Sequence, residues 1–170
     1  MEKDLFLLSM LVNNEAGVLT RVSGLFARRG FNIESLSVGE TEIKGVSRMT
    51  IMAHGDEYFR EQVVLQLEKL HDVRIVELMD LDATVMRELV LIKVKVSDQL
   101  CRSQILEAVS IFRAKVIDLS PTSLTVEITG EKAKIDAFVE YLTPYGISEL
   151  CRTGVTAIGR GNNILNQKMN

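Results

Sequence analysis

The sequence is poor in several residue types that mark specialised classes of protein. Its 170 residues include no tryptophan, two prolines and two cysteines, and aromatic residues make up 5% of the chain. Cys101 and Cys151 form neither a CxxC pair nor a closely spaced set of the kind that binds zinc. We therefore expect free thiols in a reducing compartment, and a cytoplasmic protein.

Long runs of one chemical character are also missing. The stretch MEKDLFLLSM has acidic residues beside its single lysine, and its apolar run soon reaches Asn13. This pattern is typical neither of a signal peptide nor of a transmembrane helix. The formal net charge is −3 and no long basic run is present, which argues against nucleic acid as a partner. We expect neither a membrane nor a nucleic acid to be bound.

The remaining composition is that of an ordinary globular protein, with 46% hydrophobic and 25% charged residues. A chain of this length suits one large domain or two small ones. Two halves of about 80 residues would each bury a thin core, so we expect a partner surface to contribute to stability.

Hydrophobic periodicity predicts four strands and two helices in the first half of the chain. The predicted strands cover residues 5–12, 31–40, 47–55 and 73–79, and the apolar helical stripes cover 18–26 and 59–70. The apolar phase slips between Ile33 and Leu36, which predicts a bulge. The order β-α-β-β-α-β fits the ferredoxin-like arrangement.

The second half repeats this order, which indicates two such units in tandem and an α+β fold. Strands are predicted at 87–96, 115–120, 123–130 and within 147–158, with helical stripes at 105–112 and 135–142. The stretch DLDAT, Asp80 to Thr84, interrupts the apolar pattern and reads as a linker. The expected domains are residues 4–79 and 84–160, followed by a polar tail at 161–170 that we expect to fray.

The loop between the first predicted strand and helix carries the candidate binding chemistry. The first amides of a helix have no intrahelical acceptor and favour an anion such as a carboxylate. Gly17 has no Cβ, so a ligand can approach its backbone. Asn14 can accept from an ammonium group and donate to a carboxylate. Together these features suit an α-amino acid zwitterion. The same residues also suit a plain helix cap and turn, which spacing alone favours.

Several motifs resemble those of a known family. The entry NNEAGVLTRV and the exit RRGFNIES resemble an ACT domain, the βαββαβ module that senses amino acids. Together with SRMTI, RELVLIKV, IFRAKVIDLSP and RTGVTAIGRG, they resemble the small regulatory subunit of acetolactate synthase (acetohydroxyacid synthase). The resemblance runs from about Leu5 to Gly161, with the motifs in order.

This resemblance implies a binding site between two copies of the chain. In the family, two ACT domains join edge to edge as a homodimer and valine binds between them. The glycine loop of one chain would hold the carboxylate through its amides, and Asn32 would reach the ligand from the other chain. Asn13 stands where relatives often carry glutamate, which leaves the affinity open. The implied effector-binding residues are Asn14, Gly17, Val18, Leu19, Asn32 and Ile33.

The resemblance also implies the biochemical role. We see no nucleophile–base pair, no metal spacing and no cofactor motif, so we expect no catalytic site, metal or cofactor in this chain. The partner would be the large catalytic subunit, which carries thiamine diphosphate, Mg²⁺ and FAD. The small subunit would activate it, and valine would withdraw that activation. Leucine and isoleucine remain alternative effectors because a pocket distinguishes one methylene by only about 1–3 kcal/mol. The alternative function is a free-standing ACT-type sensor that acts on another enzyme or on transcription.

Overall fold

The computed structural model describes residues 5–165 and divides into two compact units. Unit 1 comprises the residues up to Val85 together with those from Val155 onward, and unit 2 comprises Met86–Gly154. Within the described residues, no helix combines the length and the apolar character needed to span a membrane.

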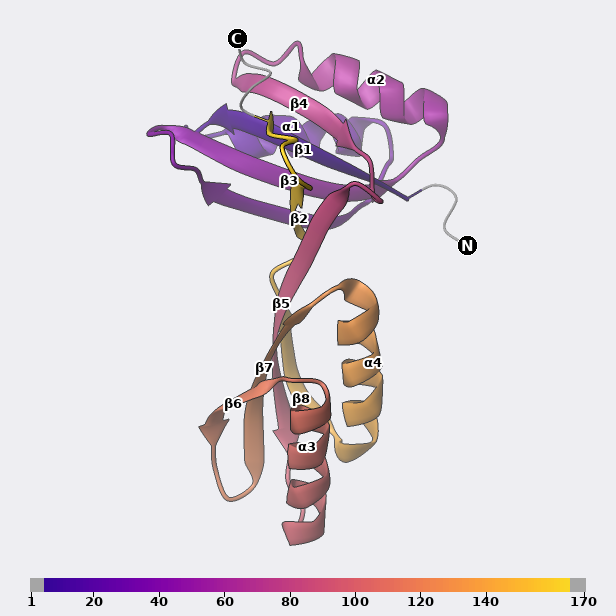
Figure 1. Cartoon of the computed structure of the whole chain (residues 1–170). Coiled ribbons are helices and arrows are strands. Elements are labelled where there is room, and N and C mark those ends of the chain that lie inside the picture. The colour runs from indigo at the N-terminus through magenta and orange to yellow at the C-terminus, as the bar shows by residue number, and fades with distance from the viewer. Residues whose placement is uncertain (1–4, 166–170) are drawn as a thin grey trace. The chain divides into compact units, whose positions relative to one another are not determined.

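Unit 1 is a four-stranded antiparallel sheet with two helices on one face (Figure 1). Its elements are β1 (Leu5–Asn13), α1 (Val18–Arg28), β2 (Ile33–Glu40), β3 (Val46–His54), α2 (Glu57–Leu67) and β4 (Val73–Met79). The strand order is β2-β3-β1-β4, and β2 and β4 form the two edges. The register of β2 against β3 shifts between Ile33 and Ser35, which confirms the predicted bulge.

The main core of unit 1 lies between the sheet and its helices. Alternate residues of β1 and β3 face α1 and α2, as the period of two in a strand requires. The helices contribute apolar residues at spacings of three and four. The largest members of this core include Phe6, Leu8, Met10, Val22, Phe26, Ile51, Phe59 and Leu67.

The opposite face of the same sheet is covered by the C-terminal segment. Val155 is fixed to β2, because its amide donates to Ser35 Oγ at 2.7 Å and its carbonyl accepts from Ser37 Oγ at 2.8 Å. Farther along, Leu165 is only 5% exposed and packs with Leu11 and Val46. The expectation that the tail from residue 161 frays is therefore wrong for Leu165, because this leucine buries its side chain on an apolar sheet face. Residues 166–170 of that tail lie outside the described residues.

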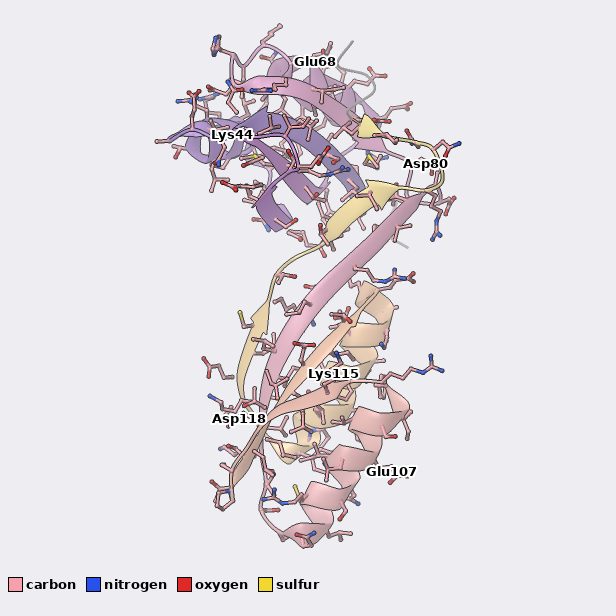
Figure 2. The ribbon with its side chains drawn as sticks, turned by 60° about the vertical axis from the view of Figure 1, so that its left-hand side comes forward. Lys44, Glu68, Asp80, Glu107, Lys115 and Asp118 are labelled. Atoms are coloured by element: carbon pink, nitrogen blue, oxygen red, sulfur yellow. The ribbon has the colours of Figure 1, made fainter. Side chains whose placement is uncertain are left out.

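Unit 2 repeats the order of unit 1. Its elements are β5 (Thr84–Lys95), α3 (Gln99–Ile111), β6 (Lys115–Leu119), β7 (Ser123–Gly130), α4 (Lys132–Leu142), a 3-10 turn η1 (Thr143–Tyr145) and β8 (Ile147–Arg152). The strand order is β6-β7-β5-β8, and the core between sheet and helices centres on Ile105 and Phe138, which are fully buried. Lys115 and Asp118 mark the edge strand β6 (Figure 2).

The predicted fold, two βαββαβ units in tandem, is confirmed. At the C-terminal end of the chain, the boundary between the compact units differs from the boundary of the expected domains. β9 (Thr156–Gly159) belongs to unit 1, although it was expected to close the second domain at residue 160. It pairs with β5, which begins in unit 1, and the Arg160 amide donates to the Ala83 carbonyl at 2.8 Å. This backbone pairing connects residues 156–160 to the part of β5 and its preceding loop that belong to unit 1.

Candidate effector-binding site

The loop from β1 to α1 leaves the first turn of the helix without a side-chain cap. Gly17 is the N-cap residue, with φ of 85°, and no side chain bonds to the helix there. By contrast, Asp56 and Asp98 cap α2 and α3 through side-chain hydrogen bonds. The left-handed backbone at residue 17 is one that glycine adopts readily and other residues adopt at a cost. The start of α1 therefore has backbone amides without a side-chain acceptor, and their binding of an anion stays a prediction.

A charged pair that the sequence did not reveal connects this loop to the residue before β4. Arg21 Nε donates to Asp72 Oδ2 at 2.6 Å, and the Asp72 carbonyl accepts from the Asn13 amide at 2.8 Å. The Arg21 side chain also lies over the loop, because Nη1 is 3.0 Å from the place where a Cβ on Gly17 would be. The end of β1, the glycine loop and α1 are thus tied to the residue before β4. Residues so distant in the sequence give no local signal of this contact.

Asn14 lies beside an acidic residue that the sequence analysis did not single out. Its side-chain amide donates to Glu40 Oε1 at 2.8 Å, and its backbone amide donates to the Gly45 carbonyl at 2.9 Å. Glu40 is the last residue of β2 and pairs with Ser47. Strand pairing therefore places a carboxylate next to the loop, where it can accept a hydrogen bond from an ammonium group.

The candidate residues do not converge within one chain. Ile33, at the start of β2, pairs with Ala53, whereas Asn13, just before Asn14, pairs with Val46 at the other end of β3. The seven-residue offset along β3 corresponds to about 23 Å. Asn32, next to Ile33, therefore lies at the opposite end of the sheet from Asn14.

The two remaining candidates differ in their exposure. Val18 is 3% exposed and packs in the core, and its amide donates to the Glu15 carbonyl at 3.5 Å. Leu19 is 45% exposed on the first turn of α1. Asn13 accepts from Arg74 Nε at 2.8 Å through its side-chain oxygen.

The described part of the chain holds no group of three or more histidine, cysteine, aspartate or glutamate side chains that could bind a metal. Cys101 is buried and Cys151 is exposed, and both are free thiols.

The fold and the loop define a class of protein: an ACT-type regulatory module joined to a second ferredoxin-like unit. A family model described as the small subunit of acetolactate synthase matches residues 87–161, and a model of the AHAS small subunit-like ACT domain matches residues 8–75.

Individual relatives agree with these two models. A probable acetolactate synthase small subunit from Methanothermobacter thermautotrophicus is 51% identical over 162 residues, which cover 95% of this chain and 96% of the relative. The acetolactate synthase small subunit of Mycobacterium bovis is 52% identical over 155 residues, 91% of each chain. The crystal structure of the acetolactate synthase small subunit from Thermotoga maritima superposes with a TM-score of 0.87 at 43% identity. This superposition covers 93% of this chain and 98% of that one. The chain belongs to the family of acetolactate synthase small subunits, which regulate branched-chain amino-acid biosynthesis.

Proposed function

We propose that two copies of the chain pair through their β2 edges and bind valine between their ACT domains. The supporting observation is that Asn14 and Asn32 lie at opposite ends of a sheet whose edge strand, β2, has a neighbour on one side only. When two β2 strands pair antiparallel about a two-fold axis, the start of one lies beside the end of the other. Asn32 of the second copy then approaches the Asn14 end of the first.

The proposed site supplies one group for each part of the amino acid. The uncapped amides at the start of α1 bind the carboxylate, and the Asn14 side-chain amide is a further donor. Glu40 and the Asn14 side-chain oxygen accept hydrogen bonds from the ammonium group. Ile33 of the second copy, half-buried in each chain, contributes an apolar wall for the branched side chain.

The protein that this dimer regulates is the large catalytic subunit of acetolactate synthase. Thiamine diphosphate, Mg²⁺ and FAD belong to that partner. It joins two pyruvates into 2-acetolactate, or pyruvate and 2-oxobutyrate into 2-aceto-2-hydroxybutyrate. The small subunit raises its activity, and valine withdraws the increase, through a coupling of about 1–3 kcal/mol between the two sites. Residues 4–79 bind the effector and dimerise in this scheme.

The experiment that tests this proposal separates activation from inhibition. The chain is combined with its large subunit, and acetolactate formation is measured while valine is titrated. We expect Asn14→Ala and Asn32→Ala to activate as the unmodified chain does but to require much more valine for inhibition. Gln99→Ala, which removes an exposed amide from unit 2, is the control and should leave the valine curve unchanged. Unchanged valine curves in both asparagine variants would place the effector site elsewhere.

A further inference from the structure

An open groove lies on the helical surface of unit 2, at the end of α4 and the turn η1. Its volume is about 430 Å³, and it is lined by Ala137, Glu140, Tyr141, Pro144 and Tyr145. These residues recur at spacings of three and four, so they share one face of the helix and its extension. All of them belong to unit 2, whereas the glycine loop and the proposed valine site belong to unit 1.

Two tyrosines form the aromatic part of this groove. The ring centroids of Tyr141 and Tyr145 are 5.8 Å apart, and the ring planes are inclined at 37°. Their hydroxyl oxygens lie 3.4 Å apart, with Tyr145 as the donor. Tyr145 packs half-buried against the core of unit 2, whereas Tyr141 is 42% exposed. The inner ring is therefore held by the core, and the outer ring keeps an accessible surface.

Negative charge surrounds the aromatic pair. The exposed Glu140 carboxylate makes no hydrogen bond or ion pair within the part of the chain that the structure describes. The pKa of Tyr145 is raised first by its hydrogen bond with Tyr141, and the nearby charge of Glu107 raises it as well. Glu107 belongs to α3, the other helix on this face of the sheet (Figure 2). None of the described residues that line the groove is a lysine or an arginine.

These features favour a planar cation as the occupant of the groove. The face of a tyrosine ring attracts a cation, and a guanidinium group can stack on a ring while it donates to a carboxylate. An acidic side chain would be repelled by Glu140 and Glu107. An apolar side chain would cover the Glu140 carboxylate without pairing it, which costs free energy.

The same charges argue against a second copy of the chain as the occupant. In a two-fold contact the same surface is present on both partners. The groove would then bring each Glu140 carboxylate towards its own copy, with no basic lining residue to compensate. A different protein that supplies the cation fits the groove better.

We propose that the groove at α4 and η1 is a docking site for an arginine side chain of the large catalytic subunit. The guanidinium group stacks on Tyr141 and donates to Glu140, and Pro144 contacts the aliphatic part of the arginine. The identity of this partner rests on the proposed function, whereas the chemistry of the docked side chain rests on the groove itself.

The test measures binding of the full chain to the large subunit by biolayer interferometry, together with activation of the large subunit. Glu140→Gln removes the unpaired charge of the groove, and Tyr141→Ala removes its exposed ring. The matched controls are Asp118→Asn, which removes an exposed carboxylate from β6, and Tyr58→Ala, which removes a 68% exposed ring from α2. In a parallel sample, p-benzoylphenylalanine in place of Tyr141 identifies the occupant of the groove by photo-crosslinking.

We expect Glu140→Gln to bind the large subunit about tenfold more weakly, because a hydrogen bond between charged groups is lost. Tyr141→Ala should weaken binding about threefold or more, because the cation loses the ring. Both controls should bind as the unmodified chain does. Rising salt concentration should weaken binding of the unmodified chain more steeply than binding of Glu140→Gln, since salt screens the ion pair. The photo-crosslink should join the chain to the large subunit.

The possible failures separate this proposal from the proposed function. If both groove variants bind as tightly as the controls, or if the photo-crosslink joins two small subunits, the docking site is overturned while activation and valine inhibition stand. If the chain binds the large subunit without activating it, the proposed function fails, and weaker binding of Glu140→Gln still supports the groove. Absence of any binding to the large subunit would overturn both.

Discussion

Replacing either of two glycines by alanine, one at the start and one in the middle of α1, should change the free energy of unfolding in opposite directions. Gly17 has φ of 85°, and a Cβ there would lie 3.0 Å from Arg21 Nη1. Gly24 lies inside α1, and its nearest contact would be Arg28 Nη1 at 3.8 Å. The two sites therefore separate the cost of a left-handed backbone from the benefit of a better helix former.

The expected magnitudes follow from these geometries. Gly17→Ala should lower the free energy of unfolding of unit 1 by about 1–2 kcal/mol, the cost of a left-handed conformation for a residue with a Cβ. The Arg21 side chain can move aside because the contact is at its flexible end. Gly24→Ala should raise the same free energy by about 0.5–1 kcal/mol, since alanine is the better residue in a helix interior.

The assay is urea unfolding of the full chain, followed through the NMR signals of the α1 amides so that unit 1 is observed. Gly39→Ala, where the added Cβ meets nothing within 4 Å, controls for the general effect of replacing glycine. Equal shifts of the same sign in Gly17→Ala and Gly24→Ala would refute the assignment of a left-handed N-cap.

Three further predictions concern the core, the pH dependence and the loop. Phe138→Ala should lower the free energy of unfolding of unit 2 by about 3–5 kcal/mol, because the ring is fully buried; a calorimetric loss below 1 kcal/mol would contradict this packing. The backbone amide of Cys101 lowers the pKa of Asp98, so this contribution to the stability of unit 2 is present above about pH 4 and is lost as the pH falls through the lowered pKa. In urea unfolding measured at several pH values, Asp98→Asn should lose that part of the dependence of stability on pH. A stability–pH curve identical to that of the unmodified chain would contradict this assignment. Asp72→Asn, which removes the charge paired with Arg21, should increase hydrogen exchange of residues 13–17 and weaken valine binding; unchanged exchange would show that the pair does not stiffen the loop.

Much of the fold could be predicted because the signals are local. The alternation of Met49, Ile51 and Ala53 places one face of β3 against the helices, and these residues are buried there. The phase slip after Ile33 appears as a register shift between β2 and β3. The glycine loop was also visible, since a glycine at a strand-to-helix junction marks a special backbone position.

The features that escaped prediction depend on contacts distant in sequence. The pattern of residues 147–158 indicates strand, but it does not say which sheet receives the strand. That outcome depends on the hydrogen bonds that Val155 forms, as donor to Ser35 and as acceptor from Ser37, and on the burial of Leu165. Glu40 likewise becomes a neighbour of Asn14 only when the strands pair.

The same limit applies to the effector site. Asn14 and Asn32 flank one helix in the sequence, yet the sheet places them at its two ends. No property of a single chain brings them together, so the proposed valine site depends on a second copy.

The most direct test of this inter-subunit site is a mixing experiment. Chains carrying Asn14→Ala and chains carrying Asn32→Ala are combined in equal amounts, allowed to exchange subunits, and titrated with valine. Each heterodimer then contains one site with both asparagines intact and one site with neither. Random exchange predicts recovery of about a quarter of the valine sites of the unmodified protein, at unmodified affinity. A mixture that binds no better than the separate variants would contradict a site built from two chains.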